Sequence, residues 1–161
     1  MTLATALFLG FIVVQRLAEL VIARRNTSKL MAAGAREVGA GHYPVMVALH
    51  ASWVVALLIF GFDQAIHAGW LVLYVLLQIA RVWILSTLGS RWTTRIIVTD
   101  TPLVASGPFR VLPHPNYALV VAEIIVAPMV LGLWGVAAVF TLLNALMLRH
   151  RIAAEDAALR P

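Results

Sequence analysis

The chain has 161 residues, of which 62% are hydrophobic and 12% are charged, with a mean hydropathy of +0.94. Soluble domains carry about 45–50% apolar and about 25% charged residues, so this composition excludes a soluble domain and predicts one membrane-embedded domain, residues 1–161. The net charge of +5 is expected in cytoplasmic loops rather than in a nucleic-acid surface, and the lack of cysteine excludes disulfides and thiol chemistry.

The first apolar block, residues 2–23, predicts a retained membrane span. No basic residue precedes it, no small-residue cleavage site follows it, and it is too long for the apolar part of a signal peptide. A helix needs about 20 apolar residues to cross the hydrocarbon core of a bilayer. Residues 43–62 and 68–88 also reach this length, so we expect three spans before the first long loop.

A fourth apolar block, residues 116–148, is too long for one span. Pro128 lies inside it, and Gly132 follows. Proline removes a backbone donor and favours a helix end just before it. We therefore predict a tight helical hairpin of residues 116–127 and 131–149. The fold class is then an all-α membrane bundle of about five helices, with a short fourth helix.

Basic residues lie after the odd-numbered spans. They are Arg24, Arg25, Lys29, Arg36, Arg91, Arg95, Arg110, Arg149, Arg151 and Arg160. The loops near Asp63 and Pro128 contain no lysine or arginine. The positive-inside rule then predicts an outside N-terminus and a cytoplasmic C-terminus. In the loop of residues 90–113, β-branched residues and a turn signal indicate a non-helical segment that could form a short hairpin over the cytoplasmic mouth.

Several polar side chains interrupt the apolar blocks: Gln15, Arg16, Glu19, His50, Gln78, Arg81, Glu123 and Asn144. Ionisable groups at membrane depth are costly and usually face a bundle interior or a wet cavity. Arg16 and Glu19 share a helix face and could pair, either to fix helix packing or to serve a function. Arg81 lies roughly two turns before the end of its span, where snorkelling to the interface is the alternative to function.

The five histidines, His42, His50, His67, His114 and His150, show no metal-ligand spacing, so no metal site is expected. We interpret His50 as a satisfied histidine within the bundle and His42 and His67 as interfacial residues. Glycine-rich nucleotide motifs and the G-x-S-x-G elbow are absent from the sequence. Any nucleotide-like cofactor must therefore be held by another design.

Two polar clusters remain, "GPFRVLPHPNY" before the fourth helix and "RHRIAAED" at the end of the fifth. His114 and Tyr117 share a face at a helix start, where free N–H groups favour anions. Arg151 and Glu155 also share a face, and Asp156 adjoins them. Each cluster alone could be a plain helix end. Because the hairpin legs are antiparallel, however, both clusters return to the cytoplasmic end, and we expect one pocket wall.

The pattern "GPFR…HPNY", an apolar hairpin and "R-x-x-x-E-D" resembles the isoprenylcysteine carboxyl methyltransferase family. That family carries G-P-Y-R-x-x-R-H-P-x-Y and R-x-x-x-E-E. The segment "RVWILSTLG" also resembles the family, and "WTTRI" is similar to a bacterial branch found beside polyketide synthases for alkylresorcinols and alkylpyrones. The resemblance covers roughly residues 75–160, and phospholipid methyltransferases share the HP-x-Y element.

The resemblance implies S-adenosylmethionine as cofactor, bound at the cytoplasmic end of the last two helices in a bacterial inner membrane. The cofactor-binding residues it implies are Arg110, His114, Asn116, Tyr117, Glu155 and Asp156, and the catalytic residues are Arg81, Arg151 and Glu155. Two positions depart from the pattern: Pro113 replaces an arginine, which removes a cationic contact, and Asp156 replaces the second glutamate.

The implied acceptor is lipophilic, either an isoprenylcysteine-like carboxylate or a polyketide-derived phenol or enol, reached from the lipid bilayer. A carboxylate is ionised near neutral pH and needs no base, whereas a phenol or enol would benefit from one such as Glu155 or His114. The alternatives are a phospholipid N-methyltransferase, an NADPH-dependent membrane reductase of the steroid-reductase type, and a non-catalytic membrane protein. Cofactor choice separates the reductase from the methyltransferases.

Overall fold

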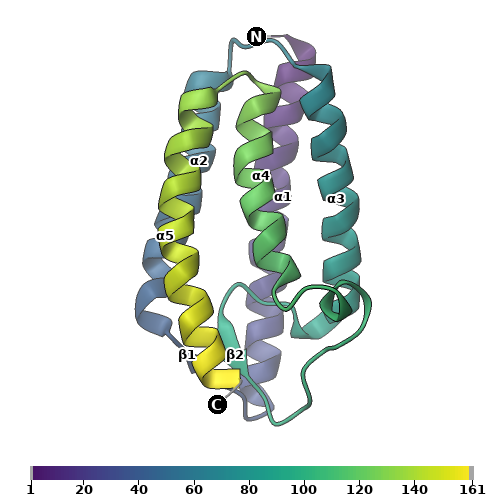
Figure 1. Ribbon diagram of the computed structural model, residues 1–161, viewed down its shortest axis with the longest axis vertical. Coiled ribbons are helices and arrows are strands. Elements are labelled where there is room, and N and C mark those ends of the chain that lie inside the picture. The colour runs from purple at the N-terminus through teal and green to yellow at the C-terminus, as the bar shows by residue number, and fades with distance from the viewer. Residues whose placement is uncertain (1, 160–161) are drawn as a thin grey trace.

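The computed structural model describes residues 2–159 as a bundle of five helices with a small cap of loops and strands at one end (Figure 1). The helices are α1 (Leu3–Ala32), α2 (Tyr43–Gly61), α3 (Ala68–Leu88), α4 (Pro115–Val130) and α5 (Trp134–Leu159). The strands are β1 (Arg36–Val38) and β2 (Ile96–Val98), and the 3₁₀ turns are η1 (Ala40–His42), η2 (Gly89–Arg91) and η3 (Gly107–Arg110). We call the end that carries the strands and the C-terminal end of α5 the loop end.

Four helices of the described region are long and apolar enough to cross a membrane: α1, α2 with its preceding turn, α3 and α5. The remaining apolar helix, α4, has 16 residues. At about 1.5 Å per residue it is roughly 24 Å long, shorter than the hydrocarbon core. The predicted set of about five spans therefore consists of four full-length candidates and the short fourth helix that the sequence indicated.

The hairpin break lies later than predicted. Helix α4 continues through Pro128 to Val130, and α5 begins at Trp134 rather than at residue 131. Pro128 sits in the last turn of α4, and its carbonyl accepts bonds from Leu131 N (3.0 Å) and Leu133 N (2.9 Å), which close the end of the helix. Gly132, with a φ of +67°, makes the turn itself.

Two helices also extend beyond their predicted ends. Helix α1 reaches Ala32 instead of residue 23, and α5 reaches Leu159 instead of residue 149. Both extensions are polar continuations of an apolar helix, and hydropathy marks only the membrane-embedded part of a helix. Both extensions lie at the loop end with the cap (Figure 1), and they include the basic residues Arg24, Arg25 and Arg151.

The predicted local hairpin within residues 90–113 does not form. Instead, β2 pairs antiparallel with β1 from the α1–α2 connection, with Glu37 opposite Ile97. Arg95 strengthens this pairing, because its Nη1 lies 2.6 Å from Glu37 Oε1 and its guanidinium stacks 4.0 Å from the Tyr43 ring. The cap is thus a long-range pairing, which local turn signals could not identify.

The apolar core fills the half of the bundle away from the loop end. It includes Phe8 and Ile12 from α1, Leu57 from α2, Tyr74 from α3 and Ile124 from α4, all nearly inaccessible. Large apolar side chains also cover the outer faces of the helices, as expected for a surface in contact with lipid. The other half of the bundle is less filled and holds a cavity.

Candidate active site

The cavity has a volume of about 550 Å³, and residues of the cap at the loop end form part of its lining. Volumes of roughly 300–1,000 Å³ are typical of small-molecule sites. All five helices, β2 and the loop before α4 contribute to its walls. It reaches from His114 near the cap to Arg16, Glu19 and Arg81 deeper in the bundle. A ligand here could therefore touch both polar clusters and the buried charges.

The start of α4 and the end of α5 form one side of the cavity, which we call the polar wall: His114, Tyr117, Arg151, Glu155 and Asp156. His114 Nε2 lies 3.2 Å from Asp156 Oδ1, and its Nδ1 lies 3.8 Å from Glu155 Oε2. The rings of His114 and Tyr117 stack with centroids 5.5 Å apart. The predicted meeting of the two sequence clusters is thus present in the structure.

Arg151 is the most connected residue of the polar wall and is only 4% exposed. Its Nη2 donates to the Thr94 carbonyl at 3.0 Å, and its Nη1 donates to Met46 Sδ at 2.8 Å. The guanidinium also lies 5.8 Å from the centre of the Tyr117 ring. One side chain on α5 therefore ties the cap, α2 and the start of α4 together.

The proline-rich segment before α4 is shaped by its backbone. Gly107 has a φ of +56°, and a β-carbon there would lie 3.0 Å from Thr87 Oγ1, so this turn packs directly on α3. Pro115 occupies the first position of α4, where its missing N–H costs no helix bond, and His114 is the N-cap. The close packing of Gly107 on α3 and the fixed backbone of Pro115 make the segment rigid. It therefore holds His114 against α5.

Most of the predicted site residues meet at the cavity. Those that line it are Arg81, His114, Asn116, Tyr117, Arg151, Glu155 and Asp156. Pro113, the departure from the family pattern, lines it as well. Arg110 is the exception, since it is exposed in η3 and does not belong to the cavity wall. Its assignment to the cofactor rested on its place in the motif alone.

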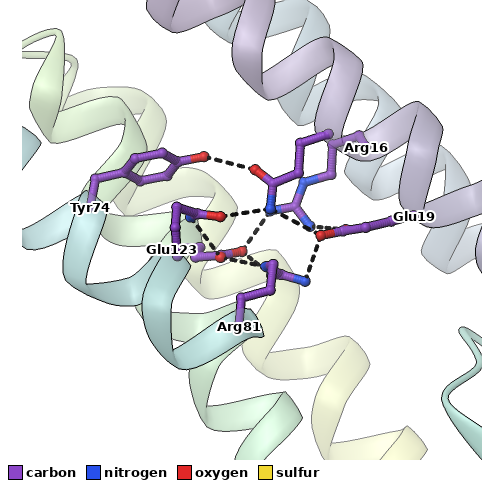
Figure 2. A network of polar contacts seen from close by, with 7 residues as sticks. Arg16, Glu19, Tyr74, Arg81 and Glu123 are labelled. Carbon is purple, nitrogen blue, oxygen red and sulfur yellow. Dashed lines mark hydrogen bonds and ion pairs between the residues drawn. The ribbon is translucent and has the colours of Figure 1, made fainter. Parts of the chain in front are cut away.

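Deeper in the bundle lies a charge network of seven residues from three helices, shown in Figure 2: Gln15, Arg16, Glu19, Tyr74, Gln78, Arg81 and Glu123. Arg16 binds Glu19 at 2.8 Å and Glu123 at 2.6 Å. Arg81 donates its Nε to Glu123 at 2.7 Å, makes a second contact with the same carboxylate, and lies 2.9 Å from Glu19. The two guanidinium groups and two carboxylates balance in charge.

The network settles two questions that the sequence left open about these residues. Arg16 and Glu19 do pair, as their spacing indicated. Arg81 does not snorkel, because it is 4% exposed and is held by Glu19 and Glu123. Burying four ionised groups in a bilayer is tolerable only with such mutual compensation.

Sequence reasoning noted three further residues but did not assign them to the site: His50 and Asn144, which line the cavity, and Glu123, which binds both arginines. Each interrupts an apolar block, and that was the available signal. The residue with which each of them pairs, however, depends on which helices pack against each other. The structure answers this by packing α4 against both α3 and α5.

Several buried polar atoms on the cavity wall lack a hydrogen-bond partner among residues 2–159. They include Asn116 Oδ1, Glu155 Oε2, Asn144 Oδ1 and Arg151 Nε. Such atoms are costly unless a ligand or water satisfies them. The acceptors Asn116 Oδ1 and Glu155 Oε2 suit the amino and hydroxyl groups of S-adenosylmethionine, so the residues present fit that cofactor. Across the described chain, no group of three potential ligands could hold a metal ion.

Comparison with known sequences identifies the family. The sequence model of the isoprenylcysteine carboxyl methyltransferase (ICMT) family matches residues 70–161, more than half of the chain. The chain belongs to the ICMT family. It is also 35% identical over 160 residues to the uncharacterized protein YpbQ of Bacillus subtilis (strain 168), covering 96% of this chain and 95% of that relative. No solved structure gives a significant match.

Family membership makes the chain a membrane methyltransferase of the ICMT type, as the motifs indicated. The polar wall lies entirely within the matched segment, whereas α1 and α2 lie before it. Those two helices nevertheless contribute Arg16, Glu19, Met46 and His50 to the cavity. The matched segment therefore holds the motif residues, and the helices outside it complete the cavity.

Proposed function

We propose that this protein transfers a methyl group from S-adenosylmethionine to an oxygen of a lipophilic acceptor, on the cytoplasmic side of a bacterial inner membrane. The observation that carries the proposal is the polar wall, which forms one side of a cavity lined by all five apolar helices. The acceptor is an isoprenylcysteine-like carboxylate or a polyketide-derived phenol or enol.

The residues of the polar wall divide naturally between recognition tasks. S-adenosylmethionine, when bound, supplies an already activated methyl group, so positioning carries most of the catalysis. Glu155 and Asp156, together with Asn116 next to the polar wall, offer acceptor oxygens for its amino and hydroxyl groups. The buried Arg151 and the N-terminus of α4 favour binding of the negatively charged carboxylate of S-adenosylmethionine.

An apolar route from the bilayer supports a lipophilic acceptor. Leu17 on α1 and Val55 on α2 both line the cavity, yet they are 58% and 50% exposed on the outer face of the bundle. The cavity thus extends to the lipid-facing surface between α1 and α2. An acceptor tail can lie there while its reactive oxygen reaches the polar wall, with Arg81 or Arg151 near enough to the cavity to hold an anionic head group.

Tritiated S-adenosylmethionine, incubated with the purified protein in nanodiscs and a lipid extract, tests the proposal. We expect label in the lipid fraction and a matching 14-dalton shift in one lipid. We also expect S-adenosylmethionine, and not NADPH, to raise the thermal midpoint of the protein. Thermal stabilisation by NADPH alone would favour the reductase. Label confined to a phospholipid amine would favour the N-methyltransferase.

Neutralising the acidic pair is expected to weaken cofactor binding. Glu155→Gln should raise the Kd for S-adenosylmethionine roughly 10- to 100-fold, since hydrogen bonds to a charged group contribute about that much. Asp156→Asn should have a smaller effect because Asp156 is more exposed. Calorimetric titration measures both, with Asp100→Asn in the exposed loop before η3 as the control. An unchanged Kd in Glu155→Gln would remove Glu155 from the cofactor site.

A further inference from the structure

His50 has a hydrogen-bonding arrangement that a packing role does not require. It lies on α2, lines the cavity, and has its Nδ1 2.9 Å from the carbonyl oxygen of Met46, one helical turn earlier. A carbonyl can only accept, so Nδ1 carries the hydrogen of this bond. In the neutral ring the other nitrogen, Nε2, then bears a lone pair, and the hydrogen bond that His50 makes within residues 2–159 is the one at Nδ1. The interpretation of His50 as a satisfied histidine within the bundle therefore applies to Nδ1.

The position of His50 places this lone pair between the two polar parts of the cavity. Met46 contacts Arg151 of the polar wall through its sulfur at 2.8 Å. His50 is four residues further along α2, or about 6 Å deeper in the bundle. Arg16, Glu19 and Arg81 line the cavity at its inner end. An acceptor whose tail lies between α1 and α2 would present its head group in this middle region.

The other candidate bases of the cavity are either engaged or assigned to the cofactor, since the proposed function gives the oxygens of Glu155 and Asp156 to S-adenosylmethionine. Glu19 accepts from Gln15 and Arg81 through Oε1 and from Arg16 through Oε2. His114 is held between Asp156 and Glu155 in the polar wall. A carboxylate that already receives charged donors on both oxygens is a poor proton acceptor. His50 Nε2 is therefore the best-placed free base within the described cavity.

We propose that His50 is the general base of the methyl transfer, and hence that the acceptor group is a weakly acidic hydroxyl rather than a carboxylate. This rests on the proposed function above. As the acceptor oxygen forms its bond to the methyl carbon, the carbon–sulfur bond breaks and its electron pair stays on sulfur as a neutral thioether. The hydroxyl proton moves to His50 Nε2 and is later released to water. A carboxylate would need no such group.

The test uses label transfer from tritiated S-adenosylmethionine to the lipid extract by the full-length protein in nanodiscs. His50→Asn is the informative variant, because its amide nitrogen can still donate to the Met46 carbonyl while the base at Nε2 is lost. We expect its rate to fall about 100-fold or more, within the range of general base catalysis. Its Kd for S-adenosylmethionine and its thermal midpoint should stay near the wild-type values. His150→Asn, at an exposed position outside the cavity wall, is the matched control.

The wild-type product gives a second, independent readout. Mild alkali releases labelled methanol from a methyl ester but leaves an aryl or enol methyl ether far more stable, so we expect alkali-stable label. A wild-type rate in His50→Asn, or an alkali-labile product, would overturn the role of His50 and leave the methyltransferase intact. Absence of both cofactor binding and lipid label in the wild type would instead overturn the proposed function, and this inference with it.

Discussion

Glu123→Ala is expected to lower the free energy of unfolding by about 3–5 kcal/mol, the usual cost of removing one partner from a buried ion pair. Glu123 is 1% exposed and receives Arg16 at 2.6 Å, Arg81 Nε at 2.7 Å and Gln78 at 3.0 Å. Without it, two guanidinium groups share Glu19 alone and the network gains a net positive charge. Thermal and denaturant unfolding in a mild detergent would measure the loss.

The matched control is Glu37→Ala. Glu37 also pairs with an arginine, at 2.6 Å, but this pair lies in the cap with Arg95 34% exposed. Exposed ion pairs contribute about 0–1 kcal/mol, so this variant should unfold close to the wild type. Equal effects of the two substitutions would show that the charge network stabilises the bundle no more than a surface pair does.

A double variant separates packing from function in the same network. Arg81→Met with Glu123→Leu removes one cation and one anion, which leaves Arg16 paired with Glu19. Buried pairs replaced by apolar residues of similar size often cost little, so most of the stability should return. If Arg81 contacts the acceptor, as the family resemblance implies, this stable double variant will still fail to transfer methyl groups. Wild-type activity would assign the network to packing alone.

The sequence carried the architecture well because membrane helices leave a strong signal in hydropathy. The four long helices were predicted because each must match the apolar thickness of a bilayer, and the short fourth helix was predicted from Pro128 inside an apolar block too long for one span. The ends of α1 and α5 were not predicted, because both helices continue past their apolar segments into polar sequence, where hydropathy carries no such constraint. The pairing of β1 with β2 was missed because it joins residues about sixty positions apart.

The residues of the candidate site also separate into those that the sequence could predict and those that depend on how distant helices pack. His114, Tyr117, Glu155 and Asp156 come from two segments that an antiparallel hairpin must bring to one end, so simple geometry was enough. Partners contributed by other helices needed the packed bundle. Glu123 binds Arg16, 107 positions earlier in the chain, and no spacing rule relates residues on different helices. His50 was visible as a polar interruption, but its tautomer follows from a single bond to the Met46 carbonyl.

Arg151→Lys is expected to reduce methyl transfer on the order of 100-fold, the scale of loss when a catalytic site is misplaced by about 1 Å. Arg151 donates in two directions at once, to the Thr94 carbonyl of the cap and to the Met46 sulfur on α2, while it covers the Tyr117 ring. A lysine ammonium is a compact point charge and cannot reproduce the planar fork that makes these contacts together.

The loss in Arg151→Lys should come from the cap and α2 moving relative to the polar wall, since the positive charge is retained. We therefore expect faster proteolysis in the loop between β2 and η3, together with the slower methyl transfer. Arg149→Lys, exposed on the same turn of α5, is the control and should behave as the wild type. If the methyl-transfer rate of Arg151→Lys equals that of the wild type, the site requires only a positive charge at this position. Arg151 would then act on a bound anion and not as the link between cap, α2 and α4.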